Sequence, residues 1–210
     1  MTSDIEKNPM TSPTRERMVA GAADLLSRRG VHATSLRTVV QYTGTPRGSL
    51  SHHFPGGKQQ MLEEAVRYAT ESVAAPLQSL LNKRGAVEGL QAFVGWWRRV
   101  LEESGFEAGC PVLAVAVEPV SSEDDAGPAG ARADEPLRAL AREAFERWES
   151  ILATALRREG VPPARARRLG ALIVASIEGT VAMCRAARSA QPLDDVHREL
   201  ESVLKSVIHP

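Results

Sequence analysis

The side chains best suited to recognise another molecule lie between positions 45 and 58. Arg47 carries a planar fork of donors that matches guanine O6 and N7 or a phosphate group, and Ser49 and Ser51 can donate hydrogen bonds to either. Just before them, Thr45-Pro46 combines a capping hydroxyl with a proline suited to a first helical position. A helix that begins there would point free backbone N–H groups at phosphate. The chemistry expected here is therefore non-covalent recognition of phosphates and base edges.

Three short helices are needed to position these side chains. The sequence predicts the first from Ser12-Pro13 to Gly30, the second from the Thr34-Ser35 cap to Gly44, and the third over residues 45–54. The glycines supply the left-handed stops, and the hydroxyl side chains supply the caps. The second and third helices, separated by a tight glycine turn, match a helix-turn-helix whose second helix fits the major groove of DNA.

The rest of the chain has the pattern of further helices. Apolar residues recur near the helical period over 58–81, where Pro76 is expected to kink or interrupt the helix. The acidic segment 118–135, rich in Pro, Gly and Ala, is expected to be a loop. Additional helices are expected over 86–103, 111–117, 136–159, 164–189 and 193–208.

The predicted fold class is therefore all-α, with two domains after a flexible arm. Residues 1–12 form the arm, 13–57 an N-terminal three-helix helix-turn-helix DNA-binding domain, and 58–210 a C-terminal helical effector-binding and dimerisation domain. The chain is neutral overall, with 26 basic and 26 acidic residues. Residues 14–58, however, hold seven basic residues against two acidic ones. This is the footprint expected for phosphate binding, although a solvated charged face would give the same count.

Other kinds of chemistry lack their motifs. There is no GxSxG sequence, and Gly56-Gly57-Lys58 does not complete a phosphate-binding loop. The two cysteines have neither CxxC spacing nor a neighbouring ligand set, so no metal, cofactor or catalytic residue is expected. No apolar run approaches the length of a membrane span, and the polar first ten residues do not resemble a signal peptide. We expect a cytoplasmic protein that does not bind membranes.

The stretch SLRTVVQYTGTPRGSLSHHFPGGKQQML resembles the DNA-binding signature of the TetR family of bacterial regulators. GCPVLAVAVE from Gly109, and more weakly IEGTVAMCRAA over 177–187, resemble the LmrA/YxaF-type branch of that family. The family usually has Tyr where this chain has Ser51, a departure that affects affinity rather than fold. The resemblance and the residue chemistry together give the candidate DNA-binding residues: Arg37, Thr45, Pro46, Arg47, Gly48, Ser49, Ser51, His52, His53 and Lys58. The two histidines could equally be helix-surface residues without a special role.

The resemblance also implies a C-terminal domain that dimerises and encloses an effector. A homodimer on a palindromic operator would double the number of base pairs that are read. Candidate dimer anchors in the last two helices are Leu172, Ile173, Ser176, Thr180, Leu200 and Leu204. The same helix faces could instead serve only the core of the monomer.

The scarce aromatic residues suggest where an effector would bind. Candidate effector-binding residues are Phe93, Trp96, Trp97, Cys110, Leu113, Phe145, Trp148, Glu178 and Met183. Residues of this kind at helical spacing are more often core than ligand contacts, and adjacent Trp96 and Trp97 cannot face the same way. Cys110 also invites interpretation as a redox switch, but no basic residue adjacent to it would lower its pKa.

These patterns favour one function over two others. The leading hypothesis is a repressor that binds double-stranded DNA at a palindromic operator as a homodimer and is released by a small, largely apolar effector. The alternative is a DNA-binding regulator controlled by a protein partner, or one without any small ligand. An enzyme with an incidental helix-turn-helix is disfavoured because the motifs of catalysis are missing from the sequence.

Overall fold

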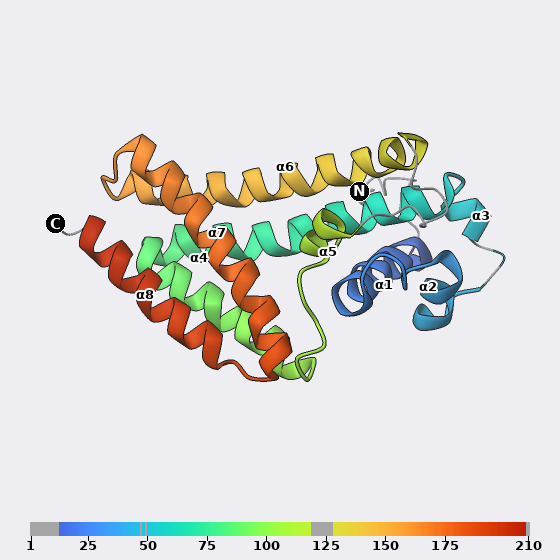
Figure 1. Cartoon of the computed structure of the whole chain (residues 1–210), viewed down its shortest axis with the longest axis horizontal. Coiled ribbons are helices and arrows are strands. Elements are labelled where there is room, and N and C mark those ends of the chain that lie inside the picture. Colours follow the sequence, from blue (N-terminus) through green and yellow to red (C-terminus); the bar gives the residue numbers. More distant parts are fainter. Residues whose placement is uncertain (1–12, 47, 49, 119–127, 209–210) are drawn as a thin grey trace, which may run out of the picture.

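The computed structural model describes residues 13–46, 48, 50–118 and 128–208, with the side chains of 50–51 and 128–134 excepted. Every regular element in these ranges is a helix, which confirms the all-α fold class. The order is α1 (Pro13–Arg29), α2 (Leu36–Thr43), α3 (Leu50–His53), α4 (Gly57–Glu103), α5 (Pro111–Val117), α6 (Pro128–Arg158), α7 (Pro163–Ala187) and α8 (Gln191–Ile208). Helices α1 to α3 gather at one end, α4 and α6 run side by side along the molecule, and α8 lies beside the second half of α4 (Figure 1). The predicted arm over residues 1–12 lies outside the described residues.

Local capping chemistry sets the bounds of the first two helices. The Ser35 hydroxyl accepts the Thr38 N–H at 3.1 Å, while the Ser35 N–H donates to the Thr38 hydroxyl at 3.2 Å. These reciprocal bonds satisfy N–H groups that a helix start otherwise leaves open. Gly30 and Gly44 have φ values of 76° and 63°. The predicted cap at residue 35 and both glycine stops are therefore confirmed.

The third helix is shorter than predicted. Thr45 and Pro46 are not helical, Gly48 belongs to a 3₁₀ turn, and the α-helix covers only Leu50–His53. Pro46 therefore does not begin an α-helix, and the prediction of a helix over 45–54 is wrong at its N-terminus. The Thr45 N–H donates to the Val40 carbonyl at 3.2 Å, which extends the turn after α2.

A glycine, and not the proline, interrupts α4. Pro76 lies inside the helix, whereas Gly85 has φ 79° and ψ −177°, where two helices meet in a kink. The Ala86 N–H, which opens the second half, donates to the Glu159 carboxylate at 2.5 Å. Glycine adopts this backbone readily, and the carboxylate caps the new helix start. Of the kink or interruption predicted at Pro76, the interruption falls instead at Gly85, and the helix predicted over 86–103 is confirmed.

Helix α5 has the predicted bounds, but the loop predicted over 118–135 is partly wrong. Helix α6 already begins at Pro128, and Pro136 lies inside it. A proline is well suited to a first helical turn, and the alanines that follow favour helix. Residues 119–127 of the predicted loop lie outside the described residues.

Helix α7 is apolar on two sides for different reasons. Its most apolar stretch has a mean hydropathy of 1.5, enough by length and composition to cross a membrane, contrary to the expectation that no run approached this length. Half of that stretch is buried inside the fold, where α7 packs against α6 and α8. The packing accounts for the buried side and leaves the apolar character of the exposed side to be explained.

Close approach of α6 and α7 depends on Gly170. A Cβ atom at this position would lie 2.7 Å from the Glu149 carbonyl oxygen, which belongs to the backbone of α6 and cannot turn away. We therefore expect Gly170→Ala to lower the free energy of unfolding by about 1–3 kcal/mol, as overpacking does. Urea unfolding measures this loss.

Gly95→Ala is the matched control for Gly170→Ala. Gly95 also lies within a helix, and a Cβ atom there would meet nothing within 4 Å. The better helix propensity of alanine should stabilise this variant by about 0.5–1 kcal/mol. Equal effects of the two substitutions would contradict the assigned contact.

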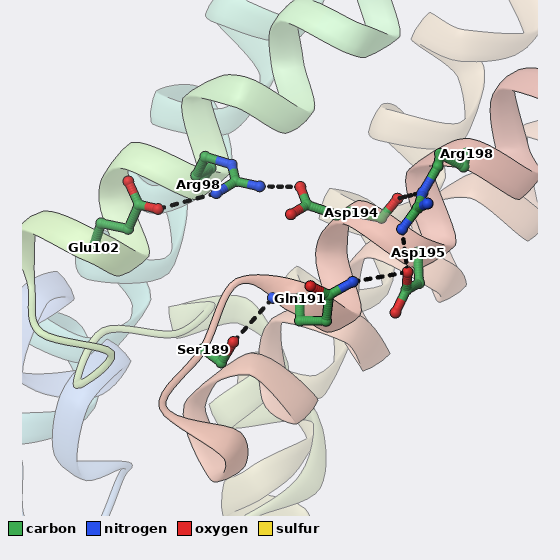
Figure 2. A network of polar contacts seen from close by, with 7 residues as sticks. All are labelled: Arg98, Glu102, Ser189, Gln191, Asp194, Asp195 and Arg198. Atoms are coloured by element: carbon green, nitrogen blue, oxygen red, sulfur yellow. Dashed lines mark hydrogen bonds and ion pairs between the residues drawn. The ribbon is translucent and has the colours of Figure 1, made fainter.

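A polar network joins the second half of α4 to the start of α8 (Figure 2). The Arg98 guanidinium donates to Asp194 and, at 3.1 Å, to Glu102. Gln191 donates to Asp195 at 3.0 Å, and Asp195 also accepts from Arg198. These side chains are partly or well exposed, so the pairs contribute little stability and mainly fix where α8 starts.

Candidate nucleic-acid interface and ligand cavity

Three contacts between α1 and α2 fix the end of α2. Gly21 in α1 leaves room for the Thr43 methyl group, which a Cβ atom would strike. The Arg17 guanidinium donates to the Thr43 carbonyl at 2.8 Å, and the Tyr42 hydroxyl donates to Asp24. The turn that leads into the candidate recognition segment therefore starts from a fixed position.

The candidate DNA-binding residues fall into an exposed set and a packed set. Arg37 in the first turn of α2, Pro46, Gly48 and His52 are exposed, and His53 is half-buried with its ring centroid 5.1 Å from that of His52. The exposed set lies along the surface that a groove-binding segment would present. These residues stay predicted DNA contacts.

Thr45 belongs to the packed set. Its side chain is only 6% exposed, and its hydroxyl lies 2.9 Å from the Thr43 hydroxyl. These contacts favour a role in holding the turn, and its predicted contact with DNA stays untested. Arg47, Ser49 and the side chain of Ser51 lie outside the described residues, so their predicted contacts also stay predictions.

Lys58 lies at the N-terminus of α4, where backbone N–H groups and a lysine could hold phosphate together. Partial burial lowers the pKa of its ammonium group, because desolvation disfavours the charged form. A phosphate beside it would favour the charged form and oppose this shift in pKa. The preceding Phe54 is buried and lies under the Arg15 guanidinium, which pairs with Glu64 at 2.7 Å. Lys58 thus follows, by a few residues in the chain, a side chain that is packed inside the DNA-binding module.

The candidate effector residues form two aromatic groups on different helices. On α4, the Phe93 and Trp96 rings stack with centroids 5.5 Å apart, and Trp97 meets Trp96 edge to face at 5.0 Å. On α6, Phe145 meets Trp148 edge to face at 5.6 Å. Phe93, Trp97 and Trp148 are buried, whereas Trp96 and Phe145 are partly buried.

Cys110 and Glu178 form a buried polar pair. The thiol is hydrogen-bonded to the carboxyl group, and burial raises the pKa of Glu178 to about 7. Burial likewise raises the pKa of Cys110 well above its ordinary value, and the neighbouring carboxylate adds to the effect. A thiol held in its protonated form is a poor nucleophile, which argues against the redox-switch interpretation. Sequence reasoning selected both residues but gave no sign that they are paired.

Two buried polar atoms among the described residues have no hydrogen-bond partner in the structure: Trp97 Nε1 and Glu178 Oε2. An orphaned buried donor and acceptor of this kind each cost about 1–3 kcal/mol and call for an explanation, such as a bound molecule. Trp148 differs, because its Nε1–H donates to the Thr70 carbonyl at 3.2 Å. Leu113 lies partly buried on α5, and Met183 is 56% exposed on α7.

The candidate dimer anchors are divided by burial. Ile173, Thr180, Leu200 and Leu204 are buried within this chain, where they contribute to the monomer core. Leu172 is 47% exposed and Ser176 is half-buried. A groove of about 530 Å³ lies between α7 and α8, and Leu172 and Ser176 line it.

A helix-turn-helix module packed on a larger all-helical domain is the architecture of a class of DNA-binding transcriptional regulators. The family models agree: residues 18–65 match the bacterial regulatory proteins of the tetR family, and residues 86–199 match the C-terminal domain of LmrA/YxaF-like transcriptional regulators. The chain belongs to the TetR family of DNA-binding transcriptional regulators and is not an enzyme.

Curated relatives and solved structures cover nearly the whole chain. It is 42% identical to the uncharacterized HTH-type transcriptional regulator Rv0196 of Mycobacterium tuberculosis, over 90% of this chain and 93% of that one. It is 30% identical to the HTH-type transcriptional regulator LmrA of Bacillus subtilis, over 91% of this chain and 97% of that one. The TetR transcriptional regulator of Legionella pneumophila has the same fold, with a TM-score of 0.74 at 21% identity over 92% of this chain and 98% of that one.

Proposed function

We propose that this regulator is a repressor that binds a palindromic operator as a homodimer and is released by a small, largely apolar effector. It would act in the cytoplasm, associated with the nucleoid when bound to its operator. The observation that carries the proposal is that Trp97 Nε1 and Glu178 Oε2 are each buried without a hydrogen-bond partner, with Trp97 lying edge to face against the Trp96 ring. A donor and an acceptor in such surroundings suit a mostly apolar ligand with one or two polar groups.

The exposed side of α7 supports a homodimer. Leu172, Ala175, Gly179, Ala182 and Met183 are exposed and recur at helical spacing, so they form one apolar face. Small residues allow a second helix to approach closely, and Leu172 and Met183 supply apolar area. Asp195 and Arg198, of opposite charge, line the groove beside Leu172 and could pair across a two-fold axis. A second copy of this chain is the occupant that fits this face.

The DNA contacts can be tested by a gel-shift titration at two salt concentrations, with the DNA that flanks the gene and with random DNA. Arg47→Ala should weaken operator binding by about 1–3 kcal/mol if Arg47 reads a base, with a smaller effect on random DNA. Lys58→Ala should weaken both equally and reduce the salt dependence, because Lys58 is assigned to phosphate. An equal loss at Arg47 on both DNAs would move that residue to the phosphate class.

The effector is tested by tryptophan fluorescence, because Trp97 carries one of the two unpartnered polar atoms. A panel of lipophilic antibiotics and metabolites should include compounds that quench the signal saturably and release the protein from its operator. Trp97→Phe removes the proposed donor and should weaken such binding. A regulator without a small ligand, or one controlled by a protein partner, would bind its operator without any such response.

A further inference from the structure

The last turn of α1 is held by three contacts from the C-terminal domain, which together we call the α1 clasp. The Val31 N–H donates to the Glu118 carboxylate at 2.8 Å, and the Gly109 N–H donates to the Ser27 carbonyl at 3.0 Å. The Arg185 guanidinium donates to the Arg28 carbonyl at 3.1 Å. The three contacts come from the end of α5, the segment before α5 and the end of α7. They join the DNA-binding module directly to the C-terminal domain.

A pocket of about 320 Å³ lies at the α1 clasp, between α1, α5 and α7. One part of its wall is apolar, with Leu113 and Val117 from α5 and Val181 from α7. Another part is charged, with the guanidinium groups of Arg29 and Arg185 and the carboxylate of Glu118. The pocket therefore offers an apolar surface and a polar edge to the same small molecule.

The pocket already binds one carboxylate, which belongs to the protein. Both Glu118 carboxylate oxygens lie too close to the position of a Cβ atom on Gly30 for a side chain to fit there. The absence of that side chain makes room for the carboxylate. The Val31 N–H completes its site. Arg185 lies over Gly109 in the same way, because a Cβ there would be 2.8 Å from Nη1. Two glycines thus create the space in which an anion and a guanidinium reach the backbone.

The balance of charge around the pocket favours a further anion. Arg28 is paired with Asp24, with Nε 3.0 Å from both carboxylate oxygens. Arg185 Nη2 bonds to a neutral carbonyl, which leaves its positive charge uncompensated by that contact. Glu107, the other carboxylate near Arg185, is engaged by Arg188 at 2.8 Å. A ligand carboxylate would gain a charge-assisted hydrogen bond from Arg185.

We propose that this pocket binds a small organic carboxylate with an apolar body, and that the ligand competes with the Glu118 side chain. The ligand carboxylate takes the place of Glu118 beside Val31 and Arg185, while its apolar body contacts Leu113 and Val181. Binding releases the contact between α5 and α1 and therefore acts on the position of the DNA-binding module. The pocket borders the buried Cys110–Glu178 pair, because Cys110 also lines it, but its test does not depend on the effector proposed for Trp97 and Glu178.

The test uses the full chain, with sodium benzoate as the probe and benzyl alcohol as its uncharged counterpart, at constant ionic strength. Binding is followed by amide NMR shifts, and those of Gly30 and Val31 should move. Benzoate should bind, whereas benzyl alcohol should bind at least about fivefold more weakly, because it lacks the charge. Equal binding of the two compounds, or benzoate shifts that spare Gly30 and Val31, would overturn the proposal.

Two variants separate competition from general charge effects. Glu118→Gln keeps an acceptor for the Val31 N–H but removes the competing charge, so benzoate should bind about fivefold more tightly. Arg185→Gln should weaken benzoate about five- to tenfold. Arg142→Gln, which removes the same charge at an exposed position on α6 outside the pocket, should change affinity less than about twofold.

The Glu118→Gln variant tests the proposed competition between benzoate and Glu118 even if Arg185→Gln proves unstable. A Glu118→Gln variant that binds benzoate no more tightly than the wild type would contradict competition by Glu118. A loss at Arg142 equal to that at Arg185 would reduce the effect to overall charge and overturn the assigned site.

Discussion

Leu172→Glu is expected to convert the regulator from a dimer into a monomer and to lower its operator affinity by at least about 100-fold. Leu172 is 47% exposed at the N-terminal end of the apolar face of α7, where it lines the groove between α7 and α8. In a two-fold interface each substitution is present twice, so two carboxylates would be brought together in a desolvated place. A single DNA-binding module then reads only one half-site, and the gain from simultaneous binding of two half-sites is lost.

Sedimentation measures the mass, and the gel shift measures the affinity for the operator. Tyr68→Glu is the matched control, since Tyr68 is 48% exposed and lies on α4, away from α7 and α8. It should leave both the mass and the operator affinity within about twofold of the wild type. A Leu172→Glu protein that remains a dimer would show that the apolar face of α7 is not the interface.

The features that were predicted from sequence depend on short-range chemistry. The Ser35 cap, the Gly30 and Gly44 stops and the helix over 111–117 each follow from a few neighbouring residues, and all appear in the structure. Capping hydroxyls and positive-φ glycines act within about four residues of the chain. Features that depend on interactions between near neighbours in the chain can therefore be predicted from sequence.

Other features of the fold depend on distant partners. The break in α4 falls at Gly85, where Glu159, 73 residues after Ala86, caps the new helix start. The α1 clasp joins Val31 to Glu118 and Arg28 to Arg185, across 87 and 157 residues. Sequence spacing cannot show which carboxylate or guanidinium will reach a given backbone group. Close approaches of this kind appear only when the helices are packed.

Helical periodicity also leaves the partner of an apolar face undefined. Ile173, Leu200 and Leu204 lie in stretches of helical apolar periodicity, as Leu172 does. The first three side chains are buried inside the chain, whereas that of Leu172 is exposed. An apolar repeat near 3.6 residues predicts that one face of a helix packs against another element. It does not predict whether that element belongs to the same chain or to a second one. The aromatic residues pose the same problem, since Trp148 donates to Thr70 as a core residue while Trp97 Nε1 has no partner in the structure.

Glu178→Gln is expected to raise the free energy of unfolding at pH 8 by roughly 2–3 kcal/mol and to leave it nearly unchanged at pH 4.5. Burial raises the pKa of Glu178 from 4.5 to about 7, so the folded protein holds this proton more tightly than the unfolded chain. The stability contributed by the protonated carboxyl group is fully present below pH 4.5. It is lost progressively as the pH rises through 7, because the folded state must then bury a charge. Glutamine stays neutral throughout, so the variant should not show this loss.

Urea unfolding of both proteins at a series of pH values, at one fixed protein concentration, measures the difference between the two curves. Glu146→Gln, at an exposed position on α6, is the control for loss of a carboxylate and should run parallel to the wild type. Parallel curves for Glu178→Gln and the wild type would mean that water reaches the Glu178 carboxylate in solution. Water would then satisfy Glu178 Oε2, and this atom would no longer support binding of a mostly apolar ligand. A divergence above pH 5 that levels off near pH 8 would establish a dry carboxyl group, ready to pair with a donor on a bound molecule.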